Sequence, residues 1–381
     1  MRIEHHPLPA ISTGTNRQVT SMHFGRDKHL DNKEKTENKK KVYIQSSLHA
    51  DEIPGMLVCH YLRQSLLELE RAGAIDGEIV LIPVANPIGL AQDIQGSAFG
   101  RFDLATGINF NRSYQYLTPE LTKRLTGRLG PNVNTNTALI REEALAILAQ
   151  WQPTNEASAL KKILQSLAID ADIVLDLHCD NQAVMHLYTG TPFAEATMPL
   201  ACYLGARALL LSVLSGDDPF DESCSRHWWE LAQQFGAATP IALGCHAITV
   251  ELRGESDLVH ESAKHDANGI IQFLIQAGHI QGGSDPLPQA LCQATPLEGS
   301  EPITASHAGA LVFTKNIGDF VAAGESIGDV VDPISGTVTP LISSVAGVLY
   351  ARVARRYAQH GMRVAKIAGA FAYRSGNLLS M

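Results

Sequence analysis

Residues 42–55, VYIQSSLHADEIPG, place three ionisable side chains between a strand and a helix. The first four residues are typical of a buried strand, and Pro54 favours the first turn of a helix, where its missing N–H costs little. His49, Asp51 and Glu52 fall at the junction, and such side chains are among the most costly to desolvate. Their position after a buried strand therefore indicates a functional site.

Strand and helix patterns alternate outward from this junction. Continuous apolar runs of strand length are separated by segments with helical periodicity, which is typical of a sheet covered on both faces. The predicted strands span residues 18–24, 42–48, 78–86, 172–178, 183–190 and 247–254. The predicted helices span residues 54–74, 141–151, 156–169, 197–214, 225–236 and 261–278. We therefore expect an α/β fold with a mixed, mostly parallel sheet and helices on both faces.

The remaining segments differ in composition, since they are charged or rich in turn-forming residues. Residues 26–41 are highly charged and predict a solvated connection, and the Gly/Asn/Thr-rich residues 113–140 predict an irregular surface excursion. Beyond a linker-like QGGSDPLPQ, short β-rich stretches are punctuated by Gly and Pro. We expect two domains, a catalytic domain over residues 1–285 and a small all-β domain over residues 286–381.

Composition limits the classes of partner. The net charge of -9 and the pI near 5.9 argue against a nucleic-acid or anionic-membrane surface, so a small molecule is the expected partner. The N-terminal sequence lacks an apolar signal core, and no run reaches the roughly 18 apolar residues of a membrane helix. We expect a cytoplasmic protein with six reduced cysteines, and its apolar helices are compatible with a homo-oligomer.

His49 and Glu52 form an H-x-x-E pair that can bring an imidazole and a carboxylate to one zinc ion. A catalytic zinc takes three protein ligands, and His178 at the end of a predicted strand is the best third candidate. Asp176 lies two residues earlier on the same strand face and can fix the His178 tautomer. Either histidine could instead be an ordinary strand-end residue.

A hydrolytic zinc site also needs a base, and Glu251 at the end of another strand fits this role. A salt bridge between Glu251 and Arg253 is the equally weighted alternative. The Gly/Asn-rich residues 86–112 predict an active-site loop. Its Arg101 and Arg112 have no obvious helical acidic partner, so we expect them to bind a carboxylate or an oxyanion, unless they are ordinary surface arginines.

These motifs together resemble the succinylglutamate desuccinylase and aspartoacylase family, a branch of the zinc carboxypeptidase fold. The resemblance rests on SSLHADEIPG, VANP, NFNR, DLHCD and TVELRG, which occur in the family's order over roughly residues 40–275. It implies that one zinc ion is held by His49, Glu52 and His178, and that Glu251 activates a water molecule. It further implies that Arg101 polarises the scissile carbonyl and that Asn111 and Arg112 bind the substrate carboxylate.

The function implied by the resemblance is zinc-dependent hydrolysis of the amide bond of a small N-acyl amino acid. Arg253 and the long segment between Arg112 and Asp172 depart from the family pattern and bear on the identity of the substrate. The β-rich end resembles the hammerhead of biotinyl and lipoyl carriers but offers no modifiable Lys at a hairpin tip, so we expect it to form a lid or wall of the active site. The alternatives are a metallocarboxypeptidase acting on short peptides and a non-catalytic metal-binding or ligand-binding relative.

Overall fold

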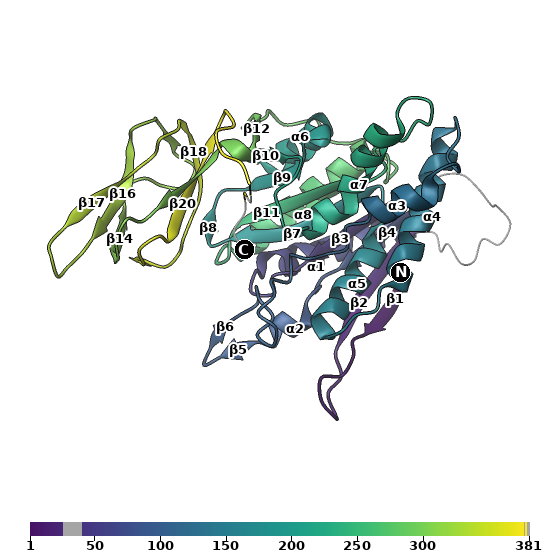
Figure 1. Cartoon of the computed structure of the whole chain (residues 1–381), viewed down its shortest axis with the longest axis horizontal. Coiled ribbons are helices and arrows are strands. Elements are labelled where there is room, and N and C mark those ends of the chain that lie inside the picture. Colours follow the sequence, from purple (N-terminus) through teal and green to yellow (C-terminus); the bar gives the residue numbers. More distant parts are fainter. Residues whose placement is uncertain (26–39, 377, 379–381) are drawn as a thin grey trace.

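The structure is a computed structural model that describes residues 1–25, 40–376 and 378 (Figure 1). The solvated connection predicted over residues 26–41 lies, apart from its last two residues, outside the described residues. A large sheet flanked by helices occupies the centre of the molecule, and smaller sheets built from the C-terminal residues lie at one end (Figure 1).

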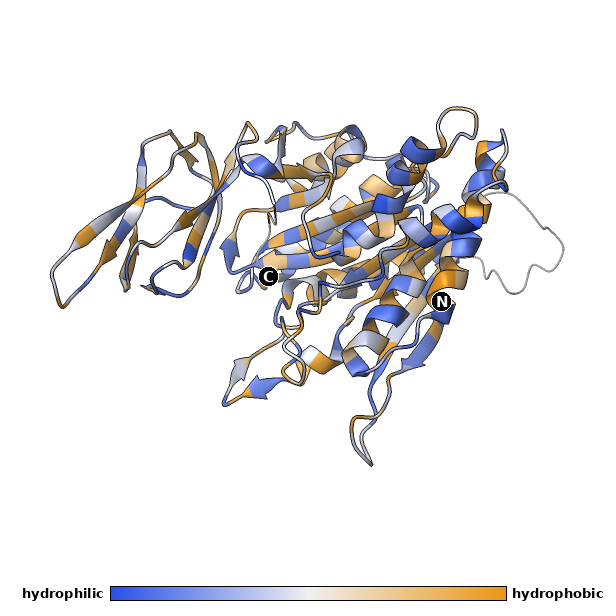
Figure 2. Cartoon of the chain, in the orientation of Figure 1, coloured by the Kyte–Doolittle hydropathy of each residue, from blue (hydrophilic) through white to orange (hydrophobic). Residues whose placement is uncertain are grey.

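The large sheet is mixed and mostly parallel, because five of the eight pairings between its described strands are parallel. Apolar residues run along its central strands, which are buried on both faces (Figure 2). Its strands, in spatial order, are β1 (Arg2–Pro7), β2 (Gln18–Gly25), β4 (Glu78–Ile82), β3 (Lys41–Ser46), β7 (Ile173–Asp180), β11 (His246–Gly254), β9 (His186–Gly190), β10 (Ala208–Ser212) and β12 (Ala294–Pro296).

Helices pack on both faces of this sheet, as the sequence predicted. One apolar core lies between the sheet and α1 (Pro54–Arg71), α6 (Ala194–Leu204) and α8 (His260–Gln276). The other core lies beneath α3 (Thr118–Leu125), α4 (Val133–Gln150), α5 (Glu156–Ala168) and α7 (Phe220–Phe235). The sheet therefore presents only its edges and its strand ends to other parts of the chain.

The C-terminal residues form additional antiparallel sheets, which confirms the β-rich ending. One sheet contains β13 (Ser300–Thr304), β20 (Arg363–Gly369), β18 (Gly347–Arg352) and β15 (Phe320–Val321), with β8 (Gln182–Ala183) paired to β18. The other contains β17 (Val338–Ile342), β16 (Ser326–Val331), β14 (Gly309–Phe313) and β19 (Tyr357–Ala358). Because β12 pairs with β10 in the large sheet, the division at residue 285 stays a prediction.

Two predicted segments are wrong. The helix predicted over residues 197–214 ends at Leu204, because Gly205 adopts a left-handed conformation (φ 65°) as the C-cap, and residues 208–212 form β10 instead. The irregular excursion predicted over residues 113–140 contains α3 and the start of α4. Asn132 caps α4 through a bond from the Thr135 amide to its side chain, so part of the Asn/Thr-rich sequence starts a helix.

Two further predicted segments contain more elements than expected. The strand predicted over residues 183–190 is divided into β8 and β9, which pair with different sheets. The predicted loop over residues 86–112 contains the short helix α2 (Pro87–Leu90) and the hairpin of β5 (Asp93–Ile94) and β6 (Ser97–Ala98). All six cysteines are free, as predicted, and Cys292 alone is partly exposed. Among the described helices, none is long and apolar enough to cross a membrane.

Candidate active site

Three neighbouring strands, β3, β7 and β11, run parallel, so their carboxyl ends meet at one edge of the sheet. Ser47 follows β3 in a left-handed conformation (φ 58°), which turns the chain sharply before His49. Gly55 lets α1 begin against this edge, because a Cβ there would lie 2.7 Å from the Cβ of Ser46. The local sequence thus folds the H-x-x-E pair back over the strand ends.

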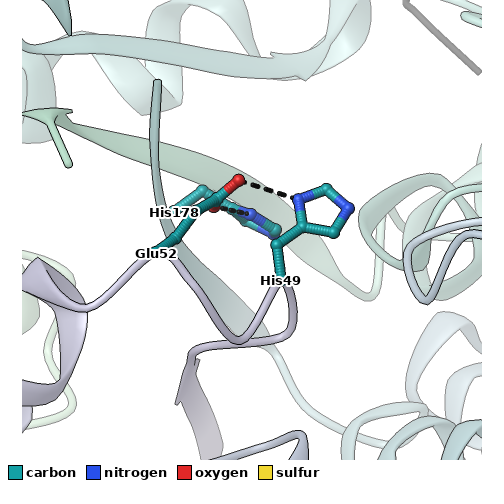
Figure 3. Close-up of side chains that lie close together, drawn as sticks. All are labelled: His49, Glu52 and His178. Carbon is teal, nitrogen blue, oxygen red and sulfur yellow. Dashed lines mark hydrogen bonds and ion pairs between the residues drawn. The ribbon is translucent and has the colours of Figure 1, made fainter. Parts of the chain in front are cut away.

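His49, Glu52 and His178 converge at this edge (Figure 3). One ligand atom from each residue lies within 4.8 Å of the other two, and the imidazole centroids of the two histidines are 4.9 Å apart. Glu52 lies between the rings, with Oε1 2.9 Å from Nδ1 of His49 and Oε2 2.6 Å from Nδ1 of His178. The structure therefore brings together the three residues that the sequence predicted as metal ligands.

Outer partners favour the tautomer that a metal ligand requires. Nε2 of His178 lies 2.9 Å from the buried carboxylate of Asp176, the contact that the sequence predicted. Nε2 of His49 lies 2.9 Å from Oδ1 of Asn109. Both imidazoles can therefore donate through Nε2 and direct an Nδ1 lone pair to the point where His49, Glu52 and His178 meet, which we call the centre. Two imidazole nitrogens and one carboxylate fit a divalent metal ion such as zinc.

The ionisable groups of this cluster shift one another's pKa values. Burial opposes the ionised form of Glu52, but the two histidines lower the pKa of this carboxyl group well below its usual range. Burial likewise opposes protonation of His178, yet the carboxylates of Asp176 and Glu52 raise its pKa well above 6.5. Burial lowers the pKa of His49 to about 4, with the Arg101 charge acting in the same direction. The carboxylates of Glu52 and Asp176 therefore stabilise a positive charge at this position, as a bound cation would supply.

Glu251 lies on β11 directly opposite His178 on β7. Its Oε2 atom is buried and has no hydrogen-bond partner among the described residues. Burial, reinforced by the charge of Glu52, raises the pKa of this carboxyl group to about 8. The alternative pairing with Arg253 is not found, because the Arg253 guanidinium forms an ion pair with Asp266 on α8. Glu251 thus has the position and the proton affinity of an acid–base group.

Arg101 reaches the centre from the loop between β6 and α3. The close approach of Gly100 makes this possible, since a Cβ there would lie 2.1 Å from the backbone nitrogen of Asp51. The Arg101 guanidinium is 3.6 Å from Oε1 of Glu52 and 3.3 Å from Nδ1 of His49. Arg101 thus has an acidic neighbour that lies outside the helices, and its place beside the predicted ligands is the one expected.

Asn111 and Arg112 line the same cavity and are buried. The Asn111 side chain accepts a hydrogen bond of 2.9 Å from the backbone N–H of Phe220, the first residue of α7. The Arg112 guanidinium donates to the backbone carbonyl of Asn111 at 2.6 Å. This strand-to-helix loop is consequently fixed against the start of α7.

The cavity has a volume of about 360 Å³ and includes residues that the sequence did not single out. Asp221 and Thr249 line it from α7 and β11, while Tyr350 and Lys366 line it from the C-terminal sheet. The C-terminal sheet thus forms one wall of the cavity, as expected. Asn109 and Thr249 belong to the NFNR and TVELRG motifs, so those motifs could have identified them, whereas Asp221, Tyr350 and Lys366 stand in no local pattern.

Comparisons with known proteins show a family match for the segment that carries the first two predicted ligands. Residues 38–138, which contain His49, Glu52, Arg101 and the NFNR motif, match the family model of the succinylglutamate desuccinylase/aspartoacylase catalytic domain. No curated protein is significantly similar to the chain.

Solved structures resemble the whole chain. A protein from Shewanella amazonensis SB2B assigned to the succinylglutamate desuccinylase/aspartoacylase family has a TM-score of 0.81 and 25% identity, with 97% of this chain and 98% of that chain covered. A protein with the same assignment from Shewanella frigidimarina NCIMB 400 has a TM-score of 0.80 and 23% identity over 97% of both chains.

The ectoine utilization protein EutE (DoeB) from Ruegeria pomeroyi has a TM-score of 0.66 and 15% identity, with 96% of this chain and 95% of that chain covered. At such low identity the likeness to this protein shows the fold alone, as does the likeness to the Shewanella frigidimarina protein. The family match over residues 38–138 and the full-length structural likeness together show that the chain resembles the succinylglutamate desuccinylase/aspartoacylase family, which is of the deacylase type.

Proposed function

We propose that the chain hydrolyses the amide bond of a small N-acyl amino acid with one zinc ion bound by His49, Glu52 and His178. The observation that carries the proposal is the meeting of this donor set with Glu251 at one edge of the sheet. The family relationship supports a deacylase. The cavity volume of about 360 Å³ suits a small substrate.

When bound, a zinc ion supplies Lewis-acid polarisation and lowers the pKa of water towards about 7. The Glu251 carboxylate accepts the proton of the attacking water on its unpartnered Oε2 atom and returns it to the leaving amine. Arg101 donates to the oxygen that becomes negatively charged at the scissile carbonyl, and one such donor is typically worth about 3 kcal/mol. Asn111 and Arg112 bind a carboxylate of the substrate and orient it.

The residues that bond to the two proposed histidine ligands fix the orientation of the rings. Asp176 and Asn109 hold the rings of His178 and His49, which keeps each Nδ1 atom directed at the centre. The C-terminal wall limits access of water and of long peptides to the cavity. These features favour a small acylated amino acid over an extended polypeptide.

Replacing Glu251 with Gln tests the proposal, since this change keeps the size of the side chain and removes the base. The zinc-loaded protein is assayed with N-acetyl and N-succinyl amino acids beside short peptides. We expect hydrolysis of an N-acyl amino acid, lowered by about 10²- to 10⁴-fold in Glu251→Gln at unchanged zinc content. Full activity in the variant would eliminate the role of Glu251, and hydrolysis of the peptides alone would establish a carboxypeptidase instead. No hydrolysis with zinc bound would favour a non-catalytic relative.

A further inference from the structure

A carboxylate stands in the cavity beside the residues proposed to bind a substrate carboxylate. Asp221 is the second residue of α7 and lines the cavity. Its Oδ2 atom accepts a hydrogen bond of 3.1 Å from the hydroxyl of Thr249. Thr249 precedes Glu251 by two residues on β11, so the two side chains project from the same face of the strand. Asp221 therefore lies over the same part of the cavity floor as Glu251.

The start of α7 also fixes Asp221 relative to Arg112. The backbone N–H of Phe220, next to Asp221, donates to the side chain of Asn111, next to Arg112. Burial, together with the charge of Arg101, lowers the pKa of Arg112, and the charges of Asp221, Asp217 and Glu222 oppose this effect, that of Asp221 most. An acidic and a basic side chain thus share one part of the cavity at a fixed separation.

This arrangement has a consequence for the charge of the substrate. A substrate carboxylate bound at Arg112 enters the field of Asp221, and like charges repel more strongly in a partly enclosed cavity than in bulk water. A positively charged group of the substrate at Asp221 removes the repulsion and satisfies the carboxylate. In an N-acyl amino acid the acylated nitrogen is an uncharged amide, so such a charge must come from a cationic group of the side chain, of which a second amino group is the smallest.

We propose that Asp221 is a specificity-determining residue that binds a second, cationic amino group of the substrate, so that the preferred substrate is an N-acylated diamino acid. This inference rests on the proposed deacylase function and adds the chemical class of the amine that is released. Asp221 acts by binding and not by proton transfer. A purely structural Asp221, bonded to Thr249 at the start of a helix, would affect all substrates alike.

Three N-acetyl amino acids separate these roles: Nα-acetyl-L-ornithine, its uncharged analogue N-acetyl-L-norvaline, and N-acetyl-L-glutamate. The zinc-loaded wild-type protein is expected to prefer the ornithine derivative over the norvaline derivative by at least about 10-fold in kcat/KM. In Asp221→Asn this preference is expected to disappear, through a loss of at least about 10-fold on the ornithine derivative and less than about threefold on the norvaline derivative. Equal losses on both substrates, or a wild-type preference for N-acetyl-L-glutamate, would overturn the inference.

Asp218→Asn is the matched control. It makes the same change of charge three residues earlier, at a partly exposed side chain that lies 3.4 Å from Arg226 and does not line the cavity. We expect this variant to keep the wild-type order of the three substrates. Loss of the ornithine preference in Asp218→Asn as well would indicate a nonspecific effect of charge and would overturn the inference.

A binding measurement separates failure of this inference from failure of the proposed function. Isothermal titration of free L-ornithine and of L-norvaline into the zinc-loaded wild-type and Asp221→Asn proteins requires no turnover. Tighter binding of ornithine to the wild type, lost in the variant, supports the role of Asp221 even if no N-acyl substrate is hydrolysed. Binding of ornithine that is no tighter than that of norvaline, or that is equal in the two proteins, overturns it.

Discussion

The Lys366 ammonium group on β20 forms an ion pair with the carboxylate of Asp180 at the end of β7, two residues beyond His178. The pair joins the C-terminal sheet to the strand that carries the third predicted metal ligand. Burial opposes both charges, but each partner stabilises the other, so that the pKa of Asp180 is lowered and the pKa of Lys366 is raised.

Replacing Lys366 with Met is therefore expected to destabilise the protein. The change leaves Asp180 without its main cationic partner, and we expect a loss of about 1–2 kcal/mol, which is modest because both side chains retain some contact with solvent. Urea unfolding at neutral pH measures the change. Lys315→Met is the control, because Lys315 and its partner Glu325 form a half-buried pair in the same region of the chain that does not line the cavity. An effect of Lys315→Met as large as that of Lys366→Met would contradict the assignment.

Metal content tests the predicted ligands directly. We expect purified wild-type protein to bind about one zinc ion per chain, and His49→Ala and His178→Ala to retain little after dialysis, since three protein ligands are the usual minimum of such a site. Elemental analysis by mass spectrometry measures the ratio of zinc to protein. His60→Ala serves as control because His60 is exposed on α1. Unchanged zinc content in both ligand variants would show that the ligands lie elsewhere.

The partner of His178 has its own expected effect. Asp176→Asn keeps the shape of the side chain but weakens its hold on the His178 tautomer, and we expect zinc affinity to fall by about 10- to 100-fold. Competition with a chromogenic chelator measures this affinity. Gln45 also bonds to Asp176, through its side-chain amide at 2.9 Å, so Gln45→Met separates loss of packing in this network from loss of charge. An affinity in Asp176→Asn no lower than in Gln45→Met would argue against a role of the Asp176 charge.

His227 on α7 predicts a dependence of stability on pH. It is buried, neither ring nitrogen has a hydrogen-bond partner in the described part of the chain, and burial, aided by the charge of Arg141, lowers its pKa to about 3. In the unfolded chain the pKa is about 6.5, so between these values the unfolded state binds more protons. The contribution of His227 to stability is thus fully present above pH 6.5 and is lost as the pH falls towards 3.

His227→Leu removes this titration. Relative to the wild type, the variant is expected to gain about 2–3 kcal/mol between pH 7.5 and pH 4.5, since each pKa unit corresponds to 1.36 kcal/mol. Urea midpoints at the two pH values measure the difference, and His60→Gln on the exposed face of α1 is the control. An identical pH dependence in His227→Leu and the wild type would refute the argument.

The sequence predicted the α/β fold because the buried strands are continuous apolar runs and most helices have clear periodicity. It failed at residues 208–212, since a Leu-rich run between apolar neighbours fits a buried helix as well as a buried strand. Only the left-handed Gly205 separates the two elements. The polar residues around the start of α4 indicated a loop but belong to a helix start. The side chains of Asn132 and Asn136 bond to nearby backbone atoms there.

The proposed metal ligands and Glu251 could be predicted because each lies near or just beyond the carboxyl end of a strand, and the ends of parallel strands meet at one edge. Asp221 and Lys366 could not, because their place in the cavity depends on how α7 and β20 pack, and no local motif records that packing. The partner of Arg101 was missed for a related reason. Glu52 was considered only as a ligand, although its carboxylate also faces the loop that carries Arg101.

The pairing of β8 with β18 begins only four residues after His178, where Gln182 and Ala183 meet Arg352 and Ala351. A single extended segment thus serves as the end of one sheet and the edge of another. Exchanging the C-terminal sheets for those of another protein would leave this segment without its neighbour. Any chimera that preserves the cluster of His49, Glu52 and His178 must therefore carry a matching edge strand. Residues 173–183 and 347–352 should accordingly be transferred together.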